Sequence, residues 1–335
     1  MSTGKRARVT LRDVAERAGV SPTTASFVLS GRRDMRISAA TEERVFQAAR
    51  TLDYRRLAPG AAVPATTPAI GVVCDAAGHF AGEMLRGCVA AATDHGHVVL
   101  TSHHAGLNEV AALLARGVRK FVHVGAATVT YAVPGALRGH RLVTMNNADP
   151  ASRAPAVIPD DAQAGRAVAR ALTSAGHTTG IWLVGQALPR AAAAVRRLSG
   201  IRTGLRSAGL RPAGHVRCGW FPDETRKALA ELFDAGWWER ACPTALIAMD
   251  DRAAMGVYQA VGAAGLSIPR DVSVISFDDS GLARWLHPGL SSMDLPWFGL
   301  GRRAVELLLA EGAQARVHRL PAELRTRESV GPPSR

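Results

Sequence analysis

The sequence predicts an α/β protein in which a small all-α helix-turn-helix headpiece precedes a core of two subdomains, each a doubly wound parallel sheet. Three observations predict it: two short helical patterns near the amino end, short apolar runs alternating with amphipathic segments beyond residue 69, and a Pro- and Gly-rich stretch between them. At 335 residues the chain exceeds one ordinary domain. We expect a headpiece at 1–56, a linker at 57–68, a two-lobed domain at 69–330 and a tail at 331–335.

The headpiece pattern begins with a short amphipathic helix over 11–18. Apolar residues recur at i, i+3, i+4 and i+7 from Leu11, which places them on one face of a helix. Thr10 is positioned to cap its first turn, and Gly19 supplies the sharp turn that follows. This segment is the first half of a helix-turn-helix.

A second helix is predicted to start at Pro22, with Ser21 as its N-cap. Its apolar residues Ala25 and Val28 recur at the spacing that packs them back against the first helix. A helix held in this way can enter the major groove of DNA.

A third helix over 39–52 closes the headpiece. Ser38 is its predicted cap, and its predicted inward stripe consists of Val45, Phe46, Ala49 and Leu52.

Positive charge is concentrated in the same region. Residues 1–56 hold 12 Lys and Arg against 6 Asp and Glu, about half of the net charge of +13. Arg32 and Arg33 belong to this basic set, which would lie near phosphates. A solvated basic face is the alternative, but the coincidence with a helix-turn-helix favours attraction to DNA.

Beyond the linker, seven apolar runs predict strands of parallel sheets. They are residues 69–74, 98–102, 120–125, 141–145, 180–184, 245–249 and 272–277. So many strands exceed one compact sheet, which predicts two lobes with a ligand between them at the carboxyl ends of the strands.

Composition and motifs argue against a secreted protein, a membrane protein, an enzyme and a metal-binding protein. The chain lacks a secretory signal pattern and any apolar run of about 20 residues, so we expect a cytoplasmic protein without membrane contact. It holds none of the phosphate-binding, dinucleotide-binding, serine-nucleophile or HExxH patterns, and we expect no enzyme, catalytic residue or cofactor. The pairs His95/His97 and His103/His104 could suggest a metal, but they lack partners at ligand spacing, so we expect no metal site.

Specific segments resemble the LacI/GalR family of bacterial transcriptional regulators. Residues 9–21 and 24–29 resemble the family's headpiece, and residues 70–73, 197–205, 250–256, 271–280 and 325–329 resemble its effector-binding core, which has a periplasmic-binding-protein-like fold. The resemblance implies a regulator, expected to be a repressor, that binds operator DNA as a homodimer, with a tetramer left open. It also implies a small, sugar-like effector that changes the affinity for the operator.

The resemblance places the DNA contacts on the second helix and its flanks. The implied residues are Thr10, Ser21, Pro22, Thr23, Thr24, Ser26, Phe27, Arg32, Arg33 and Val63. Many relatives carry an arginine at the position of Phe27, whose ring offers only apolar contact, for instance to a thymine methyl. Val63 stands where relatives place a minor-groove leucine, although Pro59 and Gly60 oppose a hinge helix and favour a tether.

The implied effector residues are Phe80, Asp161, Arg197, Trp220, Asp251 and Asp278. Paired hydrogen bonds from such charged side chains suit polyhydroxylated ligands. Each residue has a structural alternative: the aspartates could cap helices, Arg197 could pair with a carboxylate, and the aromatic residues could be core. Two other classes compete with the regulator, a solute-binding protein and an enzyme that carries an accessory headpiece.

Overall fold

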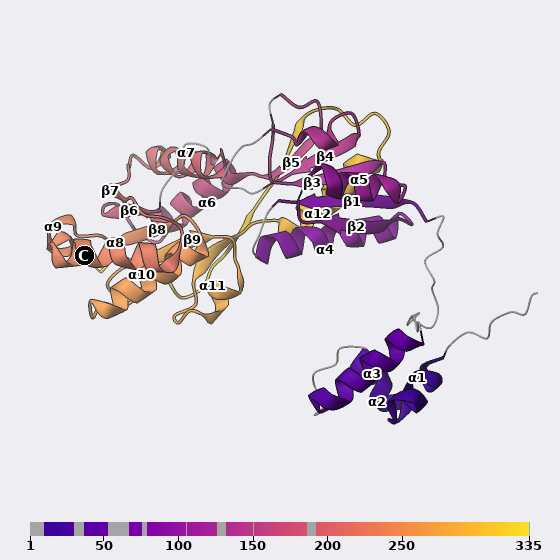
Figure 1. The fold of residues 1–335 in the computed structure, drawn as a ribbon. Coiled ribbons are helices and arrows are strands. Elements are labelled where there is room, and N and C mark those ends of the chain that lie inside the picture. Colours follow the sequence, from indigo (N-terminus) through magenta and orange to yellow (C-terminus); the bar gives the residue numbers. More distant parts are fainter. Residues whose placement is uncertain are drawn as a thin grey trace, which may run out of the picture. The chain divides into compact units, whose positions relative to one another are not determined.

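The computed structural model describes residues 10–29, 37–52, 67–75, 79–104, 106–125, 132–149, 151–185 and 192–334. The chain divides into two compact units, Met1–Thr66 and Thr67–Arg335. The described part of the first unit is helical, and the second unit is built on two sheets (Figure 1).

The first unit contains α1 (Leu11–Ala18), α2 (Pro22–Leu29) and α3 (Ala39–Thr51). The predicted cap of α1 is confirmed, because the Thr10 hydroxyl accepts the backbone N–H of Asp13 and the Asp13 carboxylate accepts that of Thr10. These hydrogen bonds lower the pKa of Asp13. Gly19 ends α1 with φ 65°, the left-handed conformation that favours glycine.

The caps of α2 and α3 are confirmed as well. The Ser21 hydroxyl accepts the backbone N–H of Thr24 at 3.0 Å, and the Ser38 hydroxyl accepts that of Thr41 at 3.3 Å. Local hydrogen bonds therefore define where each helix of the headpiece begins.

The headpiece core is made of small apolar residues from all three helices, including Val14, Val28 and Val45. The prediction that Phe46 points inward was wrong, since its side chain is 42% exposed. Phe46 follows Val45 directly and is rotated about 100° from it around the helix.

Lobe 1 of the second unit has the strand order β11-β5-β4-β3-β1-β2, with neighbouring strands parallel. Its elements are β1 (Ala69–Cys74), α4 (His79–Asp94), β2 (Val98–Ser102), α5 (Leu107–Ala115), β3 (Lys120–Val124), η1 (Gly135–Leu137), β4 (Arg141–Met145), β5 (Ala156–Pro159), α12 (Trp297–Leu309) and β11 (Val317–Leu320). Helices α4 and α12 pack on one face of the sheet and α5 packs on the other.

Lobe 2 has the order β12-β10-β9-β8-β6-β7, with only β12 antiparallel to its neighbour. Its elements are α6 (Asp161–Ser174), β6 (Ile181–Val184), α7 (Ala192–Ser207), β7 (Gly214–Val216), α8 (Pro222–Asp234), α9 (Trp237–Ala241), β8 (Ala245–Ala248), α10 (Asp251–Ala263), β9 (Ser273–Phe277), α11 (Gly281–Trp285), β10 (Ser291–Asp294) and β12 (Glu323–Arg325). Helices again cover both faces, α6 and α7 on one and α8 and α10 on the other.

All seven predicted strands are present, each within one residue of its predicted bounds. Sequence reasoning missed β5, β7, β10, β11 and β12, which have three or four residues each. Runs this short are hard to tell from loops by periodicity.

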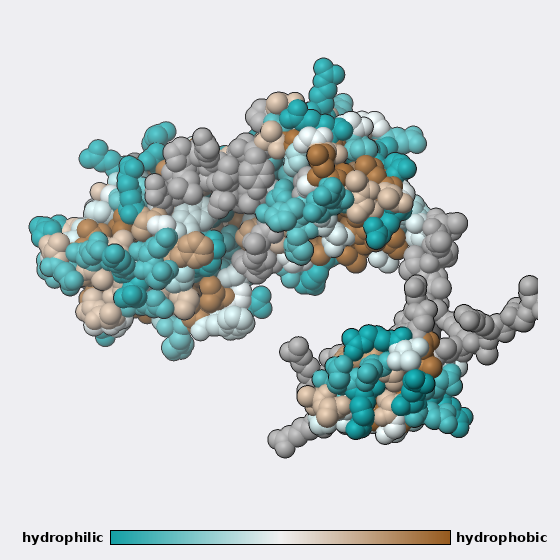
Figure 2. All heavy atoms as spheres, in the orientation of Figure 1, coloured by the Kyte–Doolittle hydropathy of each residue, from teal (hydrophilic) through white to brown (hydrophobic). Residues whose placement is uncertain are grey.

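The surface shows no continuous apolar belt in the view of Figure 2, where hydrophilic side chains cover much of both lobes and hydrophobic ones lie between them. Within the part of the chain that the structure describes, no helix is long and apolar enough to cross a membrane.

Helices α6 and α7 cross at very short distance because glycines face each other's backbone. A Cβ on Gly200 would lie 2.2 Å from the Ala162 carbonyl oxygen, and one on Gly165 would lie 2.3 Å from that of Arg197. No flexible side chain could move away to make room. The crossing brings the backbone of Arg197 directly against α6.

Replacing Gly200 by alanine should therefore destabilise the second unit by about 1–3 kcal/mol, because the new methyl group overpacks the crossing. Gly262→Ala is the matched control, since a Cβ at Gly262 in α10 meets nothing within 4 Å. Because alanine reduces the backbone freedom of the unfolded chain, Gly262→Ala should stabilise the folded protein by about 0.5–1 kcal/mol. Denaturant unfolding of both variants measures the two effects, and an unchanged midpoint for Gly200→Ala would contradict the tight crossing.

Candidate functional site

In the headpiece, the predicted DNA-binding residues of α2 fall into two groups. Ser21 and Thr24 bond to each other, with 2.9 Å between their hydroxyl oxygens, so their polar groups hold the helix start. Pro22 and Thr23 are exposed, while Ser26 and Phe27 are partly buried. Thr10 is exposed at the start of α1 and holds its cap. Arg32, Arg33, Val63 and residues 57–66 of the predicted linker lie outside the described residues.

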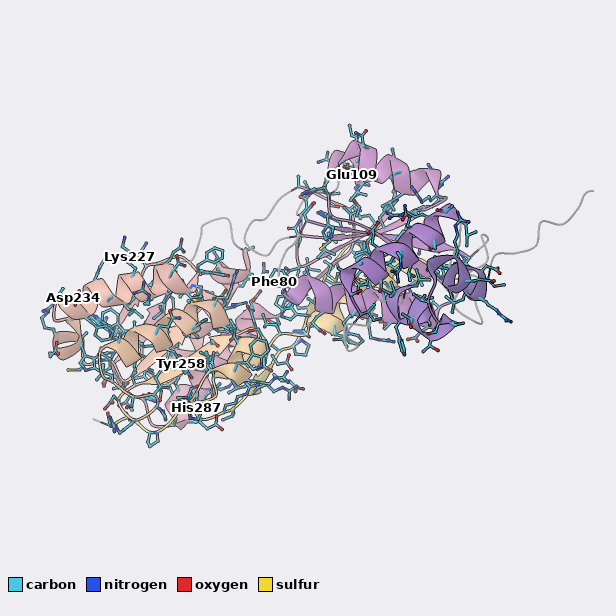
Figure 3. All side chains as sticks on the ribbon, turned by 60° about the horizontal axis from the view of Figure 1, so that its bottom comes forward. Phe80, Glu109, Lys227, Asp234, Tyr258 and His287 are labelled. Atoms are coloured by element: carbon cyan, nitrogen blue, oxygen red, sulfur yellow. The ribbon has the colours of Figure 1, made fainter. Side chains whose placement is uncertain are left out.

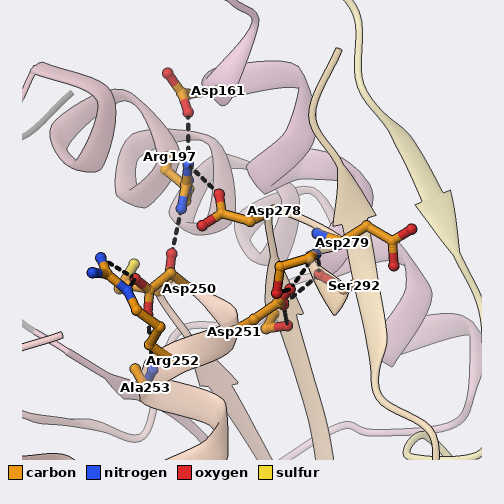
Figure 4. A network of polar contacts seen from close by, with 12 residues as sticks. Asp161, Arg197, Asp250, Asp251, Arg252, Ala253, Asp278, Asp279 and Ser292 are labelled. Carbon is orange, nitrogen blue, oxygen red and sulfur yellow. Dashed lines mark hydrogen bonds and ion pairs between the residues drawn. The ribbon is translucent and has the colours of Figure 1, made fainter. Parts of the chain in front are cut away.

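In the second unit, the side chain of Arg197 in α7 is 4% exposed and stands at the centre of a network of polar contacts (Figure 4). Its Nη2 lies 3.1 Å from Oδ1 of Asp161, the first residue of α6, and its Nη1 donates to the backbone carbonyl of Met249. The guanidinium carbon lies 4.4 Å from the centre of the Phe277 ring. The α6–α7 crossing thus brings two predicted effector residues, Arg197 and Asp161, into direct contact.

Asp161 is fully buried, and burial is the main cause of its raised pKa. Arg197 and Arg196, which lies 3.4 Å from Oδ2, oppose that shift. The alternative role of Arg197, pairing with a carboxylate, is therefore present in the structure.

Asp251 begins α10 and is held by a net of serines. Its carboxylate accepts the hydroxyls of Ser276, Ser280 and Ser292 at 2.5–2.8 Å and the backbone N–H of Ser280 at 2.7 Å. These bonds tie α10 to β9, β10 and the start of α11. Desolvation raises the pKa of Asp251, and the serine bonds oppose the shift.

The capping role falls on the neighbouring residue, Asp250, which sequence reasoning did not single out as a site residue. Its side chain accepts the backbone N–H of Ala253 at 2.8 Å and lies 2.8 Å from Arg252. It is 1% exposed, and burial raises its pKa. The run of two aspartates was its only sequence signal.

Asp278 follows β9 and has a backbone φ of 106°, unusual for a residue other than glycine. Its carboxylate is 15% exposed and lies 4.0 Å from Nη2 of Arg197, and the described residues donate no hydrogen bond to it. Burial and the neighbouring charges of Asp250 and Asp251 raise the pKa of Asp278 well above its usual value, although Arg197 opposes the shift.

Asp278 lies in the wall of a pocket of about 550 Å³. The other lining residues are Glu83, Arg86, Asp279, Ser280, Gly281, Arg284, Asp294, Leu295, Pro296, Trp297, Phe298 and Gly299. They come from α4 and α12 of lobe 1 and from the β9–α11 and β10–α12 segments of lobe 2. The pocket therefore opens where the two lobes meet.

The aromatic side chains divide between this pocket and the rest of lobe 2. Phe80 lies near the amino end of α4, where lobe 1 meets lobe 2 (Figure 3), and its ring centre is 5.3 Å from that of the pocket residue Trp297. Trp297 was not predicted from the sequence. Trp220 is partly buried, with its indole nitrogen near Gly185.

A second polar group missed by the sequence lies at the carboxyl ends of β1 and β3. The buried His123 contacts the Asp75 carboxylate through Nε2 at 2.8 Å, and His104 lies 3.7 Å from the same carboxylate. Across the described ranges, no three His, Cys, Asp or Glu side chains are grouped to hold a metal ion. The arrangement is a hydrogen-bonded pair at the end of the lobe 1 sheet.

Comparisons with known proteins match two parts of the chain. The model for bacterial regulatory proteins of the lacI family matches residues 10–56, and that for a periplasmic binding protein-like domain matches residues 169–330. A sucrose operon repressor of Shigella flexneri is 30% identical, covering 96% of this chain and 99% of its own. The transcriptional repressor PurR of Vibrio vulnificus is 28% identical, covering 96% and 98%.

The fold is also similar to that of a solved structure. A LacI family transcriptional regulator from Enterococcus faecium with bound ribose superimposes with a TM-score of 0.64 at 25% identity, covering 79% of this chain and 99% of that one.

Because the pKa of Asp278 is raised, folding favours its protonated form, and stability from this group is present at acid pH and lost as pH rises through the folded-state pKa. Asp278→Asn imitates the protonated group and retains a residue type that tolerates positive φ. We expect the variant to unfold at a higher temperature than the parent at pH 8, with the difference shrinking toward pH 5.

The control is Asp94→Asn, which removes an exposed carboxylate of α4 that pairs with Arg302. It should show no comparable dependence on pH. Equal melting differences for Asp278→Asn at both pH values would contradict the unfavourable ionisation of the buried carboxylate.

Proposed function

The chain belongs to the LacI family of bacterial regulatory proteins, and on that premise we propose that it is a transcriptional repressor whose hold on operator DNA is set by a small effector. We assign residues 1–56 to the DNA-binding headpiece, 57–68 to the hinge and 69–330 to effector binding and dimerisation. The site of action is the cytoplasm, and the activity is binding rather than catalysis.

The observation that carries the proposal is the capped pair α1 and α2 within a three-helix core. Such a pair presents its second helix to the major groove. The Ser21 and Thr24 hydroxyls hold the start of α2, which leaves Thr23 and Phe27 as the side chains we assign to base edges. Pro22 shares the base-reading positions with them. We assign backbone contacts to Thr10, Ser21, Thr24, Ser26, Arg32 and Arg33, and a minor-groove contact to Val63.

The effector half of the proposal rests on the lobe 1–lobe 2 pocket and the contacts of Arg197. We assign Phe80, Asp161, Arg197, Trp220, Asp251 and Asp278 to the effector site, and add Asp250 and Trp297 from the geometry. Charged groups beside aromatic faces suit a polar ring such as a sugar. The sucrose repressor's name and the ribose in the Enterococcus faecium structure support this class of ligand.

We propose that two copies act together, each headpiece occupying one half-site, because one headpiece offers few base contacts. The effector would shift operator affinity by a coupling free energy of about 1–3 kcal/mol.

The decisive experiment is selection of bound sequences from a random duplex pool with the full chain, followed by gel retardation at graded salt. A repressor should enrich a two-fold symmetric site, and its affinity should fall steeply with salt as phosphate contacts are lost. Failure to enrich any sequence at low salt would refute the proposal.

Phe27→Ala should weaken binding to the selected site about tenfold while changing binding to random DNA little, because an apolar contact to a base is lost and phosphate contacts remain. Phe46→Ala is the matched control, since this ring is 42% exposed on α3. Titration of both variants with operator and random duplex measures the difference. Equal losses on the two duplexes would remove Phe27 from base reading.

A further inference from the structure

The pocket between the lobes holds more acidic than basic side chains. Its charged lining residues are Glu83, Asp278, Asp279 and Asp294 against Arg86 and Arg284. Which carboxylate is available to a ligand depends on which already has a partner.

Three of the four carboxylates are paired with an arginine at short distance. Glu83 lies 2.6 Å from Arg86 and Asp294 lies 2.8 Å from Arg325. Asp279 lies 2.6 Å from Arg327. Their charges are therefore compensated within the protein.

Asp278 is the exception. The nearest cationic nitrogen is Nη2 of Arg197 at 4.0 Å, and that same nitrogen contacts Asp161 at 3.1 Å. Hydrogen bonds to the Asp278 carboxylate are absent among the described residues. A mostly buried carboxylate without a donor is unfavourable unless something else supplies one.

The pocket lining also includes an aromatic side chain, that of Trp297. Trp297 is 7% exposed, and its indole N–H is buried with no acceptor in the described part of the chain. Its ring lies beside that of Phe80. Aromatic faces of this kind pack against the apolar face of a sugar ring or a nearby cation.

We propose that the effector is a small polyol or sugar that carries a protonated amine. Its ammonium group donates to Asp278, and its ring packs against Trp297. The ammonium group provides the hydrogen-bond donor and the close positive charge that the Asp278 carboxylate lacks. This inference rests on the proposed function, because it names the ligand of the same effector site.

The test compares matched ligands on the full chain by calorimetry at pH 7: glucosamine with glucose, galactosamine with galactose, and mannosamine with mannose. We expect at least one amino sugar to bind about tenfold tighter than its hydroxyl counterpart, as one charge-assisted hydrogen bond would give. Equal affinities within every pair, no binding by any amino sugar, or tighter binding of glucuronate through Arg284 would each overturn the inference.

Asp278→Asn should lower the ratio of amino-sugar affinity to neutral-sugar affinity from about tenfold to about one, whatever happens to either affinity alone. Asp94→Asn, an exposed aspartate outside the pocket, should retain the preference. If Asp278→Asn binds the amino sugar as tightly as the parent does, the assignment of the ammonium group is wrong.

Gel retardation on the same preparations separates this inference from the function on which it rests. If the protein binds operator DNA but shows no preference for amino sugars, the proposed class of effector is wrong and the proposed repressor function is retained. If no duplex is bound, the proposed function fails, whatever the sugars show.

Discussion

The guanidinium of Arg197 is the interaction on which the rest of the cleft depends. It reaches Asp161 on α6, the carbonyl of Met249 after β8, and the ring of Phe277 at the end of β9. Removing an arginine from water is costly unless its donors are used. Asp161 and the Met249 carbonyl offset part of that cost, and glycines at the α6–α7 crossing bring the helix of Arg197 against Asp161.

Two carboxylates in lobe 2 have different roles: Asp251 holds secondary-structure elements together, whereas Asp278 faces the pocket. Asp251 is satisfied by uncharged donors, the serine hydroxyls that join α10 to β9 and β10. Asp278, only two residues beyond Ser276, faces the pocket and receives none of those bonds. Since both are acidic residues beside a strand end, the distinction arises from which donors surround each one.

The sequence allowed the central strands to be predicted because parallel strands buried on both faces read as continuous apolar runs, as in residues 69–74. The edge strand β11 alternates exposed and half-buried residues, which gave no such run. In the site, Asp250 and Asp251 are consecutive aspartates, and the sequence alone does not show which of them caps α10, because that depends on the backbone conformation. The Asp75–His123 pair joins residues 48 positions apart, which no local pattern indicates.

A ligand can shift the arrangement of two lobes only by the difference between its contacts in each arrangement. The groups around Arg197, including Asp161 and Asp278, all belong to lobe 2, whereas Phe80 and Trp297 lie on helices that pack in lobe 1. A molecule held by Arg197 and its carboxylates alone would bind equally whether the lobes were apart or together. One that contacts both Asp278 and Trp297 gains affinity only when the lobes hold both groups at the right separation, and that difference is what a regulator needs.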